Sequence, residues 1–246
     1  MNDHQLAVKL AEDAGRLLLE LRESGLGGAE LGLAGDREAN ALILDALRLE
    51  RPEDGLLSEE CIDRPDRLHV SRVWIIDPLD GTREYMSGRD DWAVHVALAI
   101  DGKPEVGAVA VPAIGRVLST GAPAPVWGSP DEPTILVSRT RAPDQAEALA
   151  KHLGARLEPM GSAGAKAAAV VAGEADLYFH AGGQNEWDNC APVAVALAAG
   201  LHASRADGSA IVYNQADVRV PDLVIGRTEL ALEAVAFLRG QSASAG

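Results

Sequence analysis

Apolar residues in the first third of the chain recur at the spacing of amphipathic helices. One helix is predicted over residues 4–23, where one face collects Leu6, Leu10, Leu17, Leu18 and Leu21. A second helix is predicted to start near Asp36, which would be its N-cap, and to end before Pro52. The inward face of this second helix carries Ala39, Leu42, Ile43, Ala46 and Leu47.

The pattern then changes to short apolar runs and strict alternation, which are typical of strands. The clearest alternation covers residues 93–100, and Asp101-Gly102 directly after it predicts a hairpin turn. Strands are predicted over residues 55–58, 72–76, 93–100, 106–111 and 116–120. Two helices followed by an antiparallel sheet indicate an α+β layer arrangement.

Residues 122–133 interrupt these patterns with four prolines, which marks a domain boundary. Beyond them strand and helix patterns alternate, which indicates an α/β second half. The strands are predicted over residues 134–137, 157–160, 175–179, 201–204 and 223–225, and the helices over residues 144–153, 163–172, 190–199 and 229–239. The chain is therefore expected to hold an α+β domain over residues 1–125 and an α/β domain over residues 126–246.

Composition and charge narrow the class of protein. The chain has 246 residues with a formal net charge of -15, which argues against binding a nucleic acid polymer. No apolar run approaches the ~20 residues that span a bilayer, and the N-terminus lacks a signal-peptide pattern. The two cysteines, Cys61 and Cys190, are too few for a disulfide framework. A cytoplasmic protein without a membrane partner is expected.

The decapeptide VWIIDPLDGT, residues 73–82, ends a buried strand with two acids. Asp77 and Asp80 would point to opposite faces of a regular strand, but Pro78 forces a turn that can bring them together. With the carbonyl of Leu79 they form a set of hard oxygen ligands suited to Mg²⁺. If Asp80 capped a helix starting at Gly81, the N–H groups of Gly81 and Thr82 would form a phosphate site. The alternative is that both acids only form the turn and the cap.

Two further acidic segments flank this one. Ser58-Glu59-Glu60 follows the first predicted strand, and Asn185-Glu186-Trp187-Asp188 precedes a helix rich in alanine. Each has an ordinary structural explanation, because surface acids are common and Asp188 suits a helix N-cap.

Together WIIDPLDGT, LLSEE and EWD resemble the lithium-sensitive, Mg²⁺-dependent phosphomonoesterase superfamily. This superfamily includes inositol monophosphatase and the 3'-phosphoadenosine 5'-phosphate (PAP) phosphatases. The resemblance covers nearly the whole chain, with G-S-A-x-x-K over residues 161–166 and GEADLY over residues 173–178. EWD and VSRTR, residues 137–141, are most similar to CysQ-type bacterial PAP phosphatases.

The resemblance implies a layered αβαβα sandwich and a two-metal site. One Mg²⁺ would be bound by Glu59, Asp77 and the Leu79 carbonyl. A second would be bound by Asp77, Asp80 and Asp188, and a third would lie near Glu59. The catalytic residues implied are Asp36, Glu59 and Thr82, with Asp36 and Thr82 helping to deprotonate the attacking water. The family usually has a threonine shortly before this acid, whereas Leu33-Ala34-Gly35 precede Asp36 here. Substrate contacts are expected at Glu59, Leu79, Asp80, Gly81, Thr82, Ser162, Lys166 and Asp188.

The activity implied is removal of the 3'-phosphate of PAP to give AMP, in sulfur metabolism, with inhibition by Li⁺. The alternative within the family is an inositol-1-phosphate phosphatase with a side activity on sugar bisphosphates. A Ca²⁺-binding module or a metal-independent glycosidase would use similar carboxylates. The partner is a small phosphate monoester, and the chain is expected to be a monomer or a homodimer.

Several other residues are weighed against structural roles. Arg139, Arg141 and Lys166 are candidates to contact a second substrate phosphate or its sugar, although basic residues on loops are usually just solvated. A structural role is favoured for His95, and core packing is favoured for Trp187 over a contact with the substrate's base. Cys61 and Cys190 follow predicted ligands by two residues, and burial as small hydrophobes is favoured over a redox role.

Overall fold

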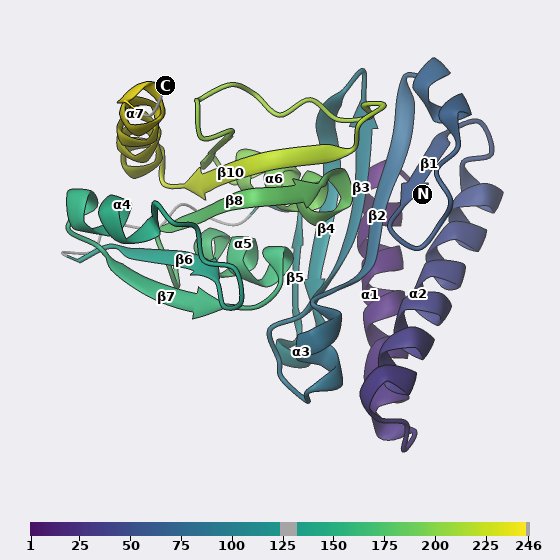
Figure 1. Ribbon diagram of the computed structural model, residues 1–246. Helices are drawn as coiled ribbons and strands as arrows, with labels where there is room; N and C mark the ends of the chain where they lie inside the picture. The colour runs from purple at the N-terminus through teal and green to yellow at the C-terminus, as the bar shows by residue number, and fades with distance from the viewer. Residues whose placement is uncertain (124–131, 245–246) are drawn as a thin grey trace.

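The computed structural model describes residues 1–123 and 132–244, and the predicted domain boundary at residue 125 lies outside them. The described helices and strands stack as five layers, helices on sheet on helices on sheet on helices (Figure 1). The helices are α1 Asp3–Glu23, α2 Gly28–Glu50, η1 Pro65–His69, α3 Thr82–Met86, η2 Pro112–Ile114, α4 Ala146–Leu153, α5 Ala163–Val171, α6 Glu186–Ala198 and α7 Thr228–Ser244. The strands are β1 Gly55–Ser58, β2 Arg72–Asp80, β3 Ala93–Ile100, β4 Lys103–Val111, β5 Arg116–Ser119, β6 Thr134–Ser138, β7 Arg156–Met160, β8 Leu177–Asn185, β9 His202–Ser204 and β10 Arg219–Gly226.

The first sheet has the order β1-β2-β3-β4-β5, with α1 and α2 on one face. It is mixed rather than wholly antiparallel as predicted, because β1 runs parallel to β2. Strand β2 is buried on both faces, which explains its unbroken apolar run. Trp74 and Ile76 pack toward α1 and α2, whereas Val73 and Ile75 pack toward the centre of the molecule.

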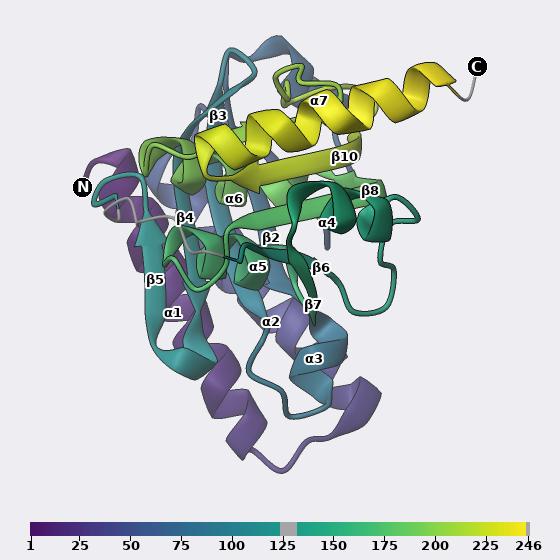
Figure 2. The same cartoon turned by 90° about the vertical axis from the view of Figure 1, so that its left-hand side faces the viewer.

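The second sheet has the order β7-β6-β8-β10-β9. Strands β7, β6 and β8 are parallel, and β8, β10 and β9 are antiparallel. Helices α4 and α7 cover its outer face, with α7 lying across the sheet (Figure 2). This half is therefore α/β with an antiparallel edge.

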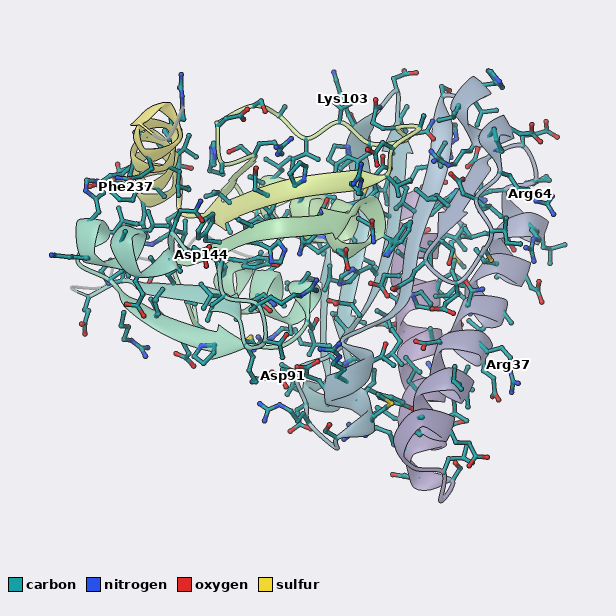
Figure 3. The ribbon with its side chains drawn as sticks, in the orientation of Figure 1. Arg37, Arg64, Asp91, Lys103, Asp144 and Phe237 are labelled. Atoms are coloured by element: carbon teal, nitrogen blue, oxygen red, sulfur yellow. The ribbon has the colours of Figure 1, made fainter. Side chains whose placement is uncertain are left out.

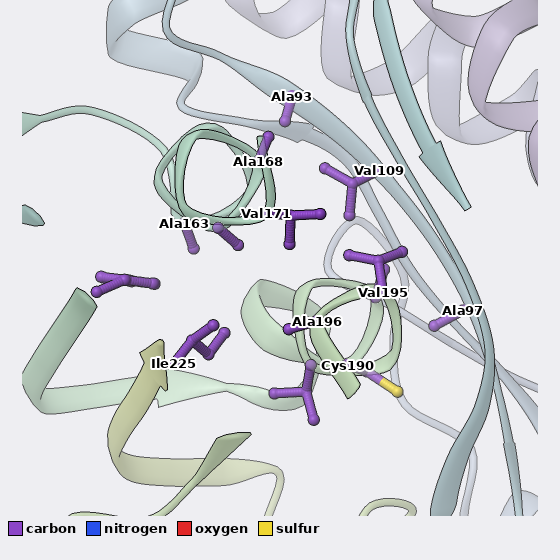
Figure 4. Packing of buried hydrophobic residues seen from close by; sticks show 14 of the residues in the cluster. Ala93, Ala97, Val109, Ala163, Ala168, Val171, Cys190, Val195, Ala196 and Ile225 are labelled. Atoms are coloured by element: carbon purple, nitrogen blue, oxygen red, sulfur yellow. The ribbon is translucent and has the colours of Figure 1, made fainter. Parts of the chain in front are cut away.

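Helices α5 and α6 form the central layer and touch both sheets (Figure 4). Their residues are small, so the helices approach the strands closely. A Cβ on Gly107 of β4 would lie 2.7 Å from the Cβ of Ala194 on α6. Alanine and glycine thus set the spacing of this layer, and the expected αβαβα sandwich is confirmed.

Some boundaries differ from those predicted. Helix α2 starts at Gly28 rather than near Asp36, so Asp36 lies inside the helix and is not its N-cap. Strand β8 runs on to Asn185 and leads directly into α6, where the sequence had suggested a loop. Within the described residues, no helix is long and apolar enough to cross a membrane.

Candidate active site

Asp77 and Asp80 are brought together by an irregularity in β2. Asp77 pairs with His95 on β3 and Asp80 pairs with Ala93, so the register shifts around Pro78. A bulge of this kind redirects side chains that a regular strand would separate. One carboxylate oxygen each from Asp77, Asp80 and Asp188 lie within 4.8 Å of one another.

Gly81 turns the chain after these acids. Its φ of 90° is left-handed, which favours glycine, and it is the N-cap of the short helix α3. The prediction that Asp80 caps this helix is therefore wrong. Asp77 Oδ1 accepts from the Leu79 N–H at 3.1 Å, and the Leu79 carbonyl oxygen accepts from the Thr82 hydroxyl at 3.1 Å.

The carboxylate of Asp80 is held by the start of α5. Its Oδ2 accepts from the hydroxyl of Ser162 and from the N–H of Gly164 at 2.7 Å. Burial would raise the pKa of Asp80, but His95 and these two donors outweigh burial and lower it. No described residue donates to Oδ1, so that oxygen remains available to a cation.

His95 joins Asp80 to the segment before Asp188. Its Nε2 lies 3.3 Å from Asp80 Oδ2, and its Nδ1 lies 3.0 Å from the carbonyl oxygen of Trp187. The ring is completely buried, and a Cβ on Gly164 would lie 2.1 Å from Nε2. The structural role predicted for His95 is thus a contact between the two halves of the acidic cluster.

Asp188 is the third residue of α6. Its Oδ2 accepts from the N–H of Asn185 at 2.6 Å, which forms a capping box with the Asn185 side chain. The N-cap itself is Asn185, so the alternative that Asp188 is the N-cap is wrong, although Asp188 takes part in the capping box. Burial and then the charge of Asp80 raise the pKa of Asp188 to about 6.

Glu59 reaches the same edge of the sheet because β1 runs parallel to β2. Its N–H donates to the Ile76 carbonyl oxygen at 3.3 Å, which sets it beside Asp77. Although Glu59 lies at the open rim, burial and then Asp188 raise its pKa to about 7. Burial, and then Glu59 and Asp80, raise the pKa of Asp77 well above its usual value. The carboxylate oxygens of these acids lie close enough together to suit the binding of a divalent cation.

Two glycines on α2 allow Asp36 to approach this edge. A Cβ on Gly32 would lie 3.1 Å from Thr82 Cγ2, and one on Gly35 would lie 3.0 Å from Leu79 Cδ2. The Thr82 hydroxyl lies 3.5 Å from Asp36 Oδ1. Burial and then the charge of Glu60 raise the pKa of Asp36 to about 6.

One wall of a cavity of about 410 Å³ between the two sheets contains Glu59, Asp77, Asp80 and Asp188, and Asp36 is not among the lining residues. The opposite wall comes from the end of β6, the start of α5 and the end of β8. It includes Ser162 and Lys166, which the sequence singled out, and Ser138, Tyr178, His180 and Gln184, which it did not. His180 and Gln184 were missed because the predicted strand stopped at Phe179, whereas Tyr178 lies within that predicted strand and carried no sign of a site. The signal for His180 and Gln184 was the polar, glycine-rich continuation HAGGQ.

The cysteines do not line this cavity. Cys190 is buried in the central core, as predicted, and burial raises the pKa of its thiol. Cys61 is exposed, with Sγ 3.4 Å from Asn40 Nδ2, so the prediction of burial is wrong for it. Trp187 packs against the central core, as favoured.

The raised pKa values predict how pH affects the metal-free chain. A carboxyl whose folded pKa lies above its unfolded pKa stabilises the fold only while protonated. The melting temperature in EDTA is therefore expected to fall as pH rises through about 6 and about 7, the pKa values of Asp188 and Glu59. Thermal unfolding over this range, in EDTA and in Mg²⁺, measures the effect. Mg²⁺ should remove much of the fall, and identical curves with and without the ion would contradict this account.

The chain is similar over residues 4–241 to the model of the inositol monophosphatase family. It is 52% identical over 234 residues to the 3'-phosphoadenosine 5'-phosphate phosphatase of Mycobacterium bovis, covering 89% of this chain and 86% of that one. It is 32% identical over 195 residues to the 3'(2'),5'-bisphosphate nucleotidase CysQ of Escherichia coli, covering 73% and 78%. The crystal structure of CysQ from Bacteroides thetaiotaomicron matches the fold with a TM-score of 0.79 and 24% identity, over 92% of this chain and 97% of that one.

Proposed function

The chain belongs to the inositol monophosphatase family, and from this premise we propose that it is a phosphatase that converts PAP to AMP. The two relatives named above carry this activity or the equivalent nucleotidase activity in their names. The observation that carries the proposal is the cluster of Asp77, Asp80 and Asp188 at one end of a cavity large enough for a nucleotide. The role would be in sulfur metabolism.

We assign the acidic cluster to Mg²⁺. Glu59, Asp77 and the Leu79 carbonyl would hold one ion, and Asp77, Asp80 and Asp188 a second, with Glu59 near a third. Bound ions would supply an activated water and positive charge for the attacking and leaving oxygens. The donor set fits, because it consists of carboxylates and a carbonyl and because no described Lys or Arg side chain donates to these acids. Inhibition by Li⁺ is part of the same proposal.

The chain's own groups would position the phosphate and move a proton. The N–H groups of Gly81 and Thr82 would bind phosphate oxygens; α3 is only five residues long, so its dipole adds little. Asp36, with a pKa of about 6 and in reach of the Thr82 hydroxyl, would accept a proton near neutral pH. Ser162 would act mainly by holding Asp80 while lining the cavity.

Kinetics on competing substrates test this proposal. With Mg²⁺ present, kcat/KM for PAP is expected to exceed that for inositol 1-phosphate by at least ~10-fold, because one charged contact to a second phosphate accounts for such a ratio. Phosphate release from PAP, inositol 1-phosphate and fructose 1,6-bisphosphate, measured side by side, gives the ratios. A higher kcat/KM for inositol 1-phosphate would favour the alternative function.

Three predictions stay open beside this proposal. They are the division into domains at residues 1–125 and 126–246, a cytoplasmic location, and a monomeric or homodimeric state. The partner we propose is a small phosphate monoester, not a nucleic acid polymer or a membrane.

A further inference from the structure

The cavity has two walls of opposite charge. The acidic wall holds Asp77, Asp80 and Asp188, and the other wall holds Arg139, Arg141, Lys166 and His180. A substrate with one phosphate needs only the acidic wall and its cations. A basic wall opposite them suits a ligand with a second anionic group.

Two of these basic groups are already bound within the protein. Arg139 donates to Glu84 Oε1 at 2.9 Å and forms an ion pair with Asp91, which lies beside α3 (Figure 3). Lys166 donates to the carbonyl oxygens of Gly161 at 3.1 Å and of Ser162, and its ammonium lies 5.0 Å from the centre of the Tyr178 ring. Arg139 thus joins β6 to the loop after α3, and Lys166 fixes the turn that holds Asp80.

Arg141 differs from both. Its backbone N–H donates to the Ser138 hydroxyl at 3.2 Å, but its guanidinium has no partner among residues 1–123 and 132–244. The side chain is exposed at the rim of the cavity. Arg83 also lines the cavity with an exposed guanidinium that has no partner among the described residues, but it follows Thr82 in α3, on the side of the acids. Among the described residues, Arg141 is therefore the free cation of the wall that faces the acids.

His180 supplies independent evidence that a ligand occupies this wall. It is 4% exposed, and its Nε2 lies 3.2 Å from the Gly183 carbonyl oxygen, so Nε2 carries the proton. Its Nδ1 is buried and has no hydrogen-bond partner in the described part of the chain. Buried polar atoms without partners are rare and costly, so this nitrogen calls for a group that would complete its hydrogen bond. Burial lowers the pKa of His180, so Nδ1 is a neutral acceptor, suited to a hydroxyl or amino group of a nucleoside.

We propose that Arg141 is a specificity-determining residue that binds the non-reacting 5'-phosphate of the substrate. The inference rests on the proposed function, because it takes PAP as the substrate. Both phosphates of PAP are attached to the same ribose, so when the 3'-phosphate lies at the acidic wall the 5'-phosphate falls within the same cavity. A planar guanidinium matches a phosphate with two parallel hydrogen bonds, and Arg141 has donors to spare.

The test compares PAP with 3'-AMP, which has the same scissile phosphate and nucleoside but lacks the 5'-phosphate. Arg141→Ala is expected to lower kcat/KM for PAP by ~10- to ~100-fold, because it removes a charge-assisted contact to the 5'-phosphate. It is expected to lower kcat/KM for 3'-AMP by less than ~3-fold. Arg141→Glu should reduce kcat/KM for PAP further, since it repels the phosphate. Inhibition by AMP, which keeps the 5'-phosphate, should weaken in parallel with kcat/KM for PAP.

Arg156→Ala is the matched control, because it removes one exposed positive charge from β7 outside the cavity. It should leave the ratio of kcat/KM for PAP to that for 3'-AMP unchanged. Equal losses on PAP and 3'-AMP in Arg141→Ala, or a wild-type chain that does not distinguish them, would overturn the assignment of Arg141 while leaving a phosphatase. A wild-type chain that hydrolyses neither nucleotide with Mg²⁺ would overturn the proposed function as well.

Discussion

Replacing Asp80 by asparagine is expected to lower kcat by at least ~100-fold without unfolding the chain. The hydroxyl of Ser162 and the N–H of Gly164 both point at Asp80 Oδ2. The amide oxygen of asparagine must therefore take that position, which turns the amide NH₂ toward the place where the free Oδ1 stood. An NH₂ group cannot bind a cation, and it would also replace the negative charge beside Asp77 and Asp188. Steady-state phosphate release at saturating Mg²⁺ measures the loss.

Asp45→Asn is the control for this substitution, since Asp45 is an exposed acid of α2 paired only with Arg48. It should keep kcat within ~2-fold, as surface changes away from a site usually do. The melting temperature in EDTA separates a local effect from a loss of fold. We expect it to fall little in Asp80→Asn, because the loss of negative charge beside His95 is offset by weaker repulsion among the acids. An Asp80→Asn chain with full kcat would refute the assignment of Asp80 as a ligand.

The acids of the site could be predicted because they are local to strand ends. A buried run that stops in Asp77 and Asp80 delivers both to a sheet edge, and the parallel pairing of β1 and β2 adds Glu59 to the same edge. Asp188 could be placed only by resemblance, since β8 and α6 approach β2 through the central layer of the fold. The strand pattern therefore located Asp77 and Asp80 as candidate ligands, whereas Glu59 and Asp188 were assigned by resemblance.

What supports these acids could not be predicted. The donors to Asp80 lie 82 and 84 residues further along the chain, at the start of α5, and no local pattern links them to a strand end. His95 looked like one residue of an alternating strand, and only the packing of Gly164 and Trp187 around its ring reveals its role. Contacts of this kind depend on tertiary packing, which overrides local propensity.

The predicted start of α2 was wrong for a related reason. Asp36 has the side chain of an N-cap and precedes a clear apolar stripe, so a helix start there agreed with the local rules. The observed helix begins at Gly28 because Leu31, Ala34 and two glycines extend the buried face by two turns against α1, β2 and α3. Packing of that face outweighs the preference of an aspartate for the cap, and it places Asp36 beside Thr82 instead.

Charge balance at the site leads to a second large effect. Glu59, Asp77, Asp80 and Asp188 meet with no lysine or arginine of the described chain bound to them. At ~4 Å two unit charges at an effective dielectric of 20 repel by ~4 kcal/mol. The described protein offsets this only in part, through His95 and by raising the pKa values of Glu59, Asp77 and Asp188. The remaining negative charge would repel a phosphate dianion unless cations were bound to the cluster first.

Chelation of divalent ions is therefore expected to lower kcat by at least ~1,000-fold, because the lost charge stabilisation of the transition state amounts to several kcal/mol. Phosphate release from PAP is measured after dialysis against EDTA and again after Mg²⁺ is returned, which should restore the activity. Ca²⁺ at equal concentration should restore far less, since its looser, larger coordination sphere fits the same oxygens without the geometry that Mg²⁺ requires. Full phosphate release in EDTA would instead fit metal-independent catalysis and would contradict the assignment of the acidic cluster to Mg²⁺. Binding of Ca²⁺ with no phosphate release in Mg²⁺ would fit a binding module.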